Sequence, residues 1–207
     1  RRKLINDCIY GVDINPEAVE VSKMSLSLKL IDNYYPKDFE AVGLLGSQIL
    51  QGVGSNIKCG NSLVDRDIIT EFPSIKDNIK ELQETNAFNW KESFPSVFEN
   101  GGFDYVVGNP PYVEVKNYNV NLPYMAEYIK RKYTSSKNGK IDLAIPFIEK
   151  GVTLLNSNGR LGYIVQKRFF KTDYGKGIRK LLTSNKKING VYDYVETDLF
   201  AGRITYV

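Results

Sequence analysis

The chain has 207 residues, 42% of them hydrophobic and 25% charged, with a formal net charge of +4, which is the balance of a globular protein with one sizeable core. It contains no histidine and only two cysteines, Cys8 and Cys59, which excludes a Ser-His-Asp or Cys-His site in this chain and gives no pattern for disulfides or a metal centre. No run is apolar and long enough for a membrane span or a signal peptide, so we expect one cytoplasmic domain without a membrane partner.

The first predicted elements are a strand and a helix. Residues 9–14 (IYGVDI) form a short apolar run that contains Asp13, which is typical of a buried strand with an acid at its carboxyl end. Asn15 is a good helix N-cap, and Pro16 suits the first helical position, where its missing N–H leaves no hydrogen bond unmade. Apolar residues then recur as far as Leu30, which indicates a helix.

Strands and helices alternate along the rest of the chain. After a polar stretch, a second strand is expected at Ile57 to Gly60, and Phe103 to Val107 forms a third behind two glycines. Residues 74–98 between them predict amphipathic helices with a break near Thr85 and Asn86. The elements expected in the second half are helices at 123–134, 142–155 and 174–183 and strands at 161–166, 191–195 and 204–207.

This alternation predicts an α/β fold with a mainly parallel sheet and helices on both faces. In such sheets, ligands bind at the carboxyl ends of the strands. Asp13, Asn61 and Asn109 each lie at the carboxyl end of a predicted strand. We therefore expect these three residues to lie along one edge of the sheet.

Asp13 is placed to accept hydrogen bonds from both hydroxyls of a ribose. An acid at this position serves equally well to complement the positive end of the helix that follows. The glycine-rich turn that should lie about 20 residues before such an acid is not found in the twelve residues that precede Asp13. We therefore expect a cofactor pocket that this chain forms only in part.

The loop of Asn109, Pro110, Pro111 and Tyr112 carries the sharpest signal. Each residue before a proline is restricted to extended conformations and each proline has a fixed φ, so the loop is stiff. It offers two neutral acceptors, the Asn109 side-chain oxygen and the Pro110 carbonyl, and Tyr112 adds a flat aromatic face. A rigid turn with an exposed tyrosine is the alternative, but the position after an apolar strand favours a site.

Two such acceptors suit the methylation of a planar amine. The lone pair of an amine on an aromatic ring is delocalised, and acceptors that bind both hydrogens draw the nitrogen toward tetrahedral geometry. The sulfonium of S-adenosylmethionine is already an activated electrophile, so the protein needs to supply only orientation and electrostatics. A histidine base is not required, because the proton can leave after transfer.

The motifs together resemble the gamma-class DNA adenine-N6 methyltransferases, especially the large type IIG restriction-modification enzymes and their phage-defence relatives. The matching segments are IYGVDINPEAVEVSKMSL, IKCGNSL, FDYVVGNPPYV, DLAIPFIEKGVTLL, GRLGYIVQKRFF and YGKGIRKLL. The resemblance implies a Rossmann-like class I methyltransferase fold and S-adenosylmethionine as the cofactor. It also implies methylation of the N6 amine of an adenine flipped out of double-stranded DNA.

The resemblance further implies a role for each motif. Asp13 and Ile14 would contact the cofactor, with Asp13 at its ribose, while Asn61 or Ser62 would lie by its adenine ring and Asn109 beside them. In the catalytic loop, Asn109 and Pro110 would bind the target amine, Pro111 would stiffen the bend and Tyr112 would stack on the flipped base. On the stacking role alone, phenylalanine in place of Tyr112 preserves most activity. Asp142 would stand at the start of the helix that flanks the base pocket, and Phe169 or Phe170 would help to wall the flipped base unless they pack in the core.

Positive charge gathers at residues 130–140, with five Lys or Arg and no acid, and at residues 167–187, with eight against Asp173 alone. Such clusters fit a polyanionic partner, although each run alone fits a solvated helix face equally well. The residues that would contact DNA phosphates are Lys167, Arg168, Lys171, Lys176, Arg179 and Lys180.

Two parts of the family's pattern would lie outside these residues. The glycine-rich cofactor loop would precede Arg1, and the target-recognition region would follow Val207, with a nuclease able to share the polypeptide. We therefore expect residues 1–207 to be a partial methyltransferase catalytic domain.

Two alternatives remain open. The same loop serves enzymes that methylate a release-factor glutamine or a ribosomal RNA guanine, and the chain can also be a catalytically incomplete DNA-binding fragment.

Overall fold

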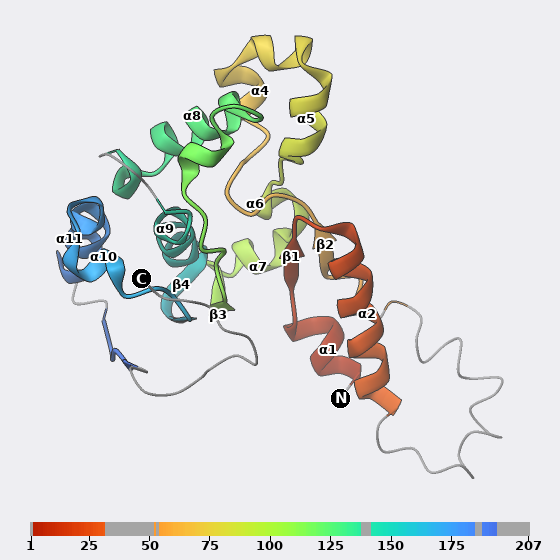
Figure 1. Ribbon diagram of the computed structural model, residues 1–207. Helices are drawn as coiled ribbons and strands as arrows, with labels where there is room; N and C mark the ends of the chain where they lie inside the picture. The colour runs from red at the N-terminus through yellow and green to blue at the C-terminus, as the bar shows by residue number, and fades with distance from the viewer. Residues whose placement is uncertain (1, 32–51, 53, 138–141, 185–187, 194–207) are drawn as a thin grey trace, which may run out of the picture.

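The computed structural model describes residues 2–31, 52, 54–137, 142–184 and 188–193, and short parallel strands lie among its helices (Figure 1). The N-terminal elements are α1 (Arg2–Cys8), β1 (Gly11–Asp13), α2 (Pro16–Ile31) and β2 (Ile57–Cys59). The middle elements are α4 (Ile68–Glu71), η1 (Pro73–Asp77), α5 (Ile79–Thr85), α6 (Trp90–Ser93) and α7 (Pro95–Glu99). The remaining elements are β3 (Phe103–Gly108), η2 (Val115–Tyr118), α8 (Pro123–Lys132), η3 (Thr134–Ser136), α9 (Ala144–Leu154), β4 (Leu155–Tyr163), α10 (Arg168–Lys171), η4 (Asp173–Gly175) and α11 (Lys176–Ser184).

The strands of the described part form two separate parallel pairs. β1 pairs with β2, with Asp13 opposite Cys59, and β3 pairs with β4, with Val107 opposite Gly162. Helix α2 packs on the first pair and α9 on the second. The parallel pairing is confirmed, but the described residues do not form the single sheet covered on both faces that the sequence predicts. On the second face of β3, Tyr105 and Val107 are 72% and 81% exposed, because no described helix packs there.

Helix α2 begins where the sequence places it. The Asn15 side-chain oxygen accepts the backbone N–H groups of Glu17 at 2.7 Å and Ala18 at 3.3 Å, as an N-cap does. The Asp13 carboxylate in turn accepts the Asn15 N–H at 2.8 Å. The end of β1 and the start of α2 are thus one hydrogen-bonded turn.

Other predicted element ends are confirmed as well. Helix α5 ends at Thr85, and Asn86 follows it in the left-handed region with a φ of 45°. Gly101 and Gly102 have φ values of 88° and 123°, which explains two glycines before β3. Pro146 lies in the first turn of α9, where a proline displaces no hydrogen bond.

The strand predicted at 161–166 begins earlier, at Leu155. Phe103 pairs with Leu155 and Tyr105 with Arg160, so residues 156–159 bulge out of the pair. Their sequence, Asn-Ser-Asn-Gly, has the composition of a turn, which is why it predicts a loop. Pairing with β3 overrides this local preference.

Of the last two predicted strands, the structure describes only residues 191–193. Residues 191–193 are in no strand and are exposed, since no described strand lies beside them to pair with their backbone. The strand predicted at 204–207 lies outside the described residues, as does most of the polar stretch before β2.

An aromatic cluster connects the two strand pairs. The Tyr10 ring, just before β1, lies 5.5 Å from the Phe103 ring, at the start of β3, and 5.1 Å from Phe94. Phe88 and Trp90 complete this cluster. β1 and β3 therefore start from the same packed group of rings.

A second core lies where α8 and α9 pack against the segment after β2. Its fully buried members include Val64, Ile68, Tyr128, Ile129 and Ile145. Burial of these side chains is the main stabilising term available to the region that carries the candidate site.

Two buried carboxylates fix the helices around this core. Glu81, only 1% exposed, accepts the first backbone N–H groups of α8 from Tyr124 at 2.6 Å and Met125 at 3.2 Å. Glu149 of α9 accepts the backbone N–H and hydroxyl groups of Thr134 and Ser135 in η3. Each carboxylate accepts hydrogen bonds from backbone N–H groups at the start of a helix, which would otherwise lack a partner.

Candidate active site

The loop 109–112 leaves the end of β3 and is held on both sides. Before the loop, the Ile164 N–H donates to the Gly108 carbonyl at 3.2 Å, and after it the Leu143 N–H donates to the Val113 carbonyl at 2.8 Å. The stiff loop is therefore fixed between β4 and the start of α9.

Gly108 brings Tyr163 close beneath the loop. A Cβ at Gly108 would lie 3.0 Å from Cε1 of Tyr163, which is tighter than an ordinary contact. Burial raises the pKa of Tyr163 to about 12, so its hydroxyl stays protonated at neutral pH. The sequence analysis missed Tyr163, and the glycine before the Asn-Pro pair is the only signal that points to a close approach there.

Within the part of the chain that the structure describes, the two predicted acceptors accept no hydrogen bond from a backbone N–H. Asn109 is exposed, and its side-chain oxygen accepts a 3.0 Å hydrogen bond from the half-buried Tyr112 hydroxyl. Pro110, next to it, is buried.

Asp142 lies beside the loop, in an antiparallel bridge with Glu114. Its carboxylate accepts the Ala144 N–H at 2.9 Å. Burial raises the pKa of Asp142 above its usual range, although this N–H and the positive charge of Arg168 act in the opposite direction. Arg168, from the predicted DNA-binding set, is therefore electrostatically coupled to the edge of the loop.

Asp13 is exposed at the end of β1. One of its oxygens accepts the Asn15 N–H, and a carboxylate has capacity for several further hydrogen bonds. Ile14, beside it, is 51% exposed. An exposed carboxylate next to an exposed apolar side chain fits the ribose of a nucleoside cofactor.

Asn61 does not share this exposure. Its side chain is buried, with the oxygen accepting the Leu63 N–H at 3.0 Å and the NH₂ donating to the Met125 sulfur at 3.4 Å. Ser62 is half-buried, and its carbonyl accepts the Trp90 indole N–H at 3.2 Å. The structure brings Asn61 and Ser62 close to the end of β2, but the Asn61 amide faces the core.

Phe169 and Phe170, the phenylalanines predicted near the base pocket, stack on each other with ring centroids 4.3 Å apart. Phe169 is 4% exposed and belongs to the core, whereas Phe170 is 39% exposed. Core packing therefore accounts for Phe169.

The second basic run lies on α10 and α11, which pack together (Figure 1). Lys167 pairs with Asp193 at 3.3 Å, and Lys176 pairs with Asp173 at 2.7 Å. Arg179 is half-buried and donates to the carbonyls of Phe169 and Thr172, the latter at 2.8 Å. Arg168, Lys171 and Lys180, the other described residues of this run, are exposed.

The first basic run bonds largely within the protein. Arg131 pairs with Glu127 at 2.8 Å, and Lys132 donates to Asp67, which also accepts the Tyr128 hydroxyl. Burial acts to raise the pKa of Asp67, but these two hydrogen bonds hold it below its usual range. These contacts fit a solvated helix face better than a phosphate contact.

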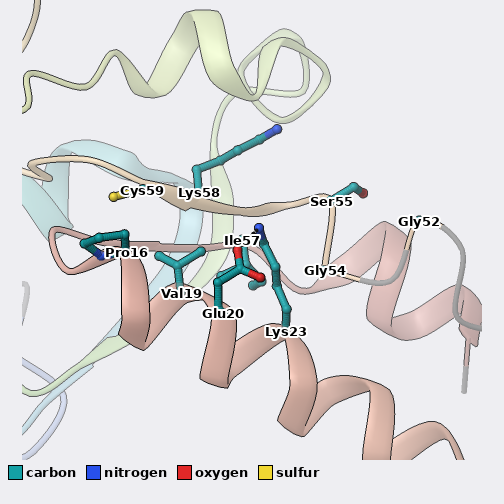
Figure 2. Close-up of a pocket in the computed structure, with 10 residues that line it drawn as sticks. All are labelled: Pro16, Val19, Glu20, Lys23, Gly52, Gly54, Ser55, Ile57, Lys58 and Cys59. Carbon is teal, nitrogen blue, oxygen red and sulfur yellow. Dashed lines mark hydrogen bonds and ion pairs between the residues drawn. The ribbon is translucent and has the colours of Figure 1, made fainter.

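A cavity of about 490 Å³ lies between α2 and the segment before β2 (Figure 2). Its lining residues are Pro16, Val19, Glu20, Lys23, Gly52, Gly54, Ser55, Ile57, Lys58 and Cys59. None of them is a predicted catalytic or cofactor-binding residue, and Lys23 already pairs with Glu20 at 2.8 Å. We assign this cavity no part in the chemistry.

Within the described ranges, no helix combines the length and apolar character that crossing a membrane requires.

Comparison with known proteins gives consistent matches. A family profile described as Eco57I restriction-modification methylase matches residues 7–200. The Escherichia coli protein named type II restriction enzyme and methyltransferase RM.Eco57I is 32% identical over 206 residues, which are 100% of this chain and 19% of that protein. Type II methyltransferase M.BstVI of Geobacillus stearothermophilus is 28% identical over 97% of this chain and 28% of its own length. Adenine-specific methyltransferase PglX of Streptomyces coelicolor is 25% identical over 82% of this chain and 14% of its own length. The chain thus spans less than a third of each of these relatives.

Proposed function

The chain belongs to the Eco57I restriction-modification methylase family, and from this premise we propose that it is part of the catalytic domain of a DNA methyltransferase. The proposed reaction moves a methyl group from S-adenosylmethionine to the exocyclic N6 amine of an adenine. The observation that carries the proposal is the loop 109–112, in which Asn109 is exposed directly after β3. The names of the relatives favour DNA as the substrate, over a release-factor glutamine or a ribosomal RNA guanine, and adenine as the methylated base.

In the proposed mechanism, the Asn109 oxygen and the Pro110 carbonyl each accept one hydrogen of the amine. This grip localises the nitrogen lone pair and directs it at the methyl donor. S-adenosylmethionine, held by Asp13 and Ile14, would supply a methyl group that its bond to a sulfonium activates for transfer. The methylated nitrogen then loses one proton to water, so neither acceptor needs to act as a base.

We assign the cofactor and the base to different residues. Asp13 accepts the ribose hydroxyls, next to the apolar surface of Ile14. Tyr112 stacks on the flipped adenine, and such stacking is worth about 1 to 3 kcal/mol per base. The Asn61 side chain is bonded inside the core, so we give the contact with the cofactor's adenine to the backbone of Asn61 and Ser62.

We assign phosphate contacts to the exposed lysines and arginine of α10 and α11. The residues are Lys167, Arg168, Lys171, Lys176 and Lys180. Arg179, of the same predicted set, keeps its role inside the protein because its guanidinium bonds two backbone carbonyls. Double-stranded DNA is therefore the proposed partner, bound through charge and without sequence information from these contacts.

We further infer a Rossmann-like fold in which the two strand pairs belong to one sheet. Tyr105 and Val107 lie exposed on one face of β3, and we infer that other parts of the polypeptide pack on this face and bury them. A nuclease in that longer polypeptide would match the name of RM.Eco57I, which gives both a restriction enzyme and a methyltransferase. We propose a target-recognition region in the same polypeptide as well.

The experiment that tests the function uses the full-length polypeptide and labelled S-adenosylmethionine with duplex DNA. We expect label in adenine, and a loss of transfer on the order of 100-fold or more in Asn109→Ala, comparable with removing one preorganised hydrogen-bonding group from other active sites. Asn121→Ala, at an exposed asparagine of a neighbouring loop, is the matched control and should transfer normally. Full transfer by Asn109→Ala, or label in protein or RNA and none in DNA, would sink the proposal.

A further inference from the structure

We propose that the Tyr112 hydroxyl is a positioning group that holds the Asn109 amide with its oxygen, and not its NH₂, toward the target amine. This inference rests on the proposed function, and it adds a second role to a residue whose ring was expected only to stack. The observation behind it is the 3.0 Å hydrogen bond from the Tyr112 hydroxyl to the Asn109 side-chain oxygen.

An asparagine side chain has two ends of nearly equal size and opposite hydrogen-bonding character. With the oxygen toward the base, Asn109 accepts a hydrogen of the target amine. After a half-turn about the last side-chain bond it would present two donors to a donor. Asn109 is exposed, so packing of neighbouring side chains does not enforce one orientation. Some other group has to select the productive one.

The Tyr112 hydroxyl is placed to make this selection. A donated hydrogen bond from this hydroxyl favours the amide oxygen over the NH₂ group on the tyrosine side. Pro110 and Pro111 between the two residues fix the bend that brings the hydroxyl back to Asn109. An amide oxygen has two lone pairs, so the bond to Tyr112 leaves one to accept from the target amine.

The hydroxyl and the ring therefore make separable contributions. The ring binds the flipped base by stacking, which phenylalanine also does. The hydroxyl acts on the orientation of Asn109 and hence on the transfer step. The expectation from stacking alone, that phenylalanine preserves most activity, is replaced by a selective loss in the transfer rate.

The test compares Tyr112→Phe with the unmodified full-length polypeptide in two assays. Base flipping is followed by the fluorescence of 2-aminopurine at the target position, and methyl transfer to adenine is followed in single turnovers with enzyme in excess. For Tyr112→Phe we expect base flipping within about twofold of the unmodified polypeptide and a rate of methyl transfer about tenfold lower, which is the scale of one hydrogen bond. Tyr192→Phe, at a tyrosine that is 84% exposed and lies outside the loop 109–112, removes a hydroxyl elsewhere and should leave both assays unchanged.

Repeating the Tyr112→Phe substitution in the Asn109→Asp variant tests whether the Tyr112 hydroxyl acts through Asn109. In Asn109→Asp the two carboxylate oxygens are equivalent and need no orientation, so adding Tyr112→Phe should slow transfer by less than about twofold. Single turnovers with excess enzyme are followed over hours, which keeps a slow background measurable.

Three results would overturn this role: normal transfer by Tyr112→Phe, a parallel loss of flipping and transfer, or equal losses in both backgrounds. Normal transfer by Tyr112→Phe with an inactive Asn109→Ala removes only the positioning role. An active Asn109→Ala removes the proposed function itself.

Discussion

Glu81 connects the stability of the protein to the region of its candidate site. Its carboxylate holds the start of α8 through the Tyr124 and Met125 N–H groups, and the Met125 sulfur accepts from the Asn61 amide after β2. Because Glu81 is almost fully buried, water cannot replace these bonds when the carboxylate is removed.

We therefore predict that Glu81→Ala lowers the free energy of unfolding by about 2 to 3 kcal/mol, since two backbone donors lose their partner in a buried place. Denaturant unfolding of the protein followed by circular dichroism measures this change. Glu84→Ala is the matched control, because Glu84 is an exposed residue of the same helix with a long ion pair to Lys80, and it should shift stability by less than about 0.5 kcal/mol. Equal effects of the two variants would show that the buried bonds contribute little.

At the scale of single residues, the sequence predicts the parts of the site that follow from local rules. The Asn15 cap and the stiff loop 109–112 depend on neighbours within a few positions, so residue type and spacing suffice. Asn61 and Arg179 behave differently. The partner of the Asn61 amide is Met125, 64 positions away, and the carbonyls that bind Arg179 are exposed to it only once α10 and α11 pack.

At the scale of elements, periodicity and end signals predict most helices and the first three strands. The exception is β4, which begins with Leu155 opposite Phe103 and then bulges out at the turn-forming residues 156–159. Strand pairing is a contact between distant segments, and local composition does not encode it.

The packing of α11 depends on a glycine that no periodic pattern singles out. A Cβ at Gly177 would lie 2.9 Å from both Cα and the carbonyl oxygen of Ser135 in η3. Both are backbone atoms, held in turn by the buried Glu149 carboxylate. The helix therefore cannot accommodate a methyl group at this point without moving away from η3.

We predict that Gly177→Ala destabilises the protein by about 1 to 2 kcal/mol, even though alanine favours a helix over glycine by up to about 1 kcal/mol. Thermal unfolding measures the shift, and Thr183→Ala, at an exposed position of the same helix, should change stability by less than about 0.5 kcal/mol. A stabilised Gly177→Ala would mean that α11 is not seated on η3.

At the scale of the whole molecule, alternation of elements predicts parallel strands but not how the pairs join. β1 and β3 start from one aromatic cluster, yet within the described part each bonds only to its sequential partner. Whether two pairs form one sheet depends on what lies between them, and that is a property of the complete polypeptide. The catalytic loop is predictable without this knowledge because β4 and α9 hold it locally.

The distribution of charge over the molecule leads to the last prediction. The net charge is only +4, but the two basic runs differ in how their side chains are engaged. In the first run Arg131 pairs with Glu127, whereas Lys171 and Lys180 of the second run are exposed on neighbouring helices and, within the described ranges, form no ion pair. Of the proposed phosphate contacts, Lys171 and Lys180 are therefore the ones to replace.

Each phosphate contact contributes about 0.9 to the slope of log K against log salt concentration. Replacing both Lys171 and Lys180 by Ala should therefore lower that slope by about 2, while weakening binding to specific and non-specific duplexes alike. The double variant Lys130→Ala with Arg131→Ala removes the same charge from the first run and should leave the slope unchanged. Fluorescence anisotropy titrations of the full-length polypeptide at several salt concentrations measure both slopes. Both variants lower the net charge by two, so equal slopes would mean that DNA binding depends only on the overall charge. A lower slope confined to the Lys171 and Lys180 variant would instead place the DNA on α10 and α11. Arg168, whose charge acts on Asp142 beside the loop, belongs to the same surface.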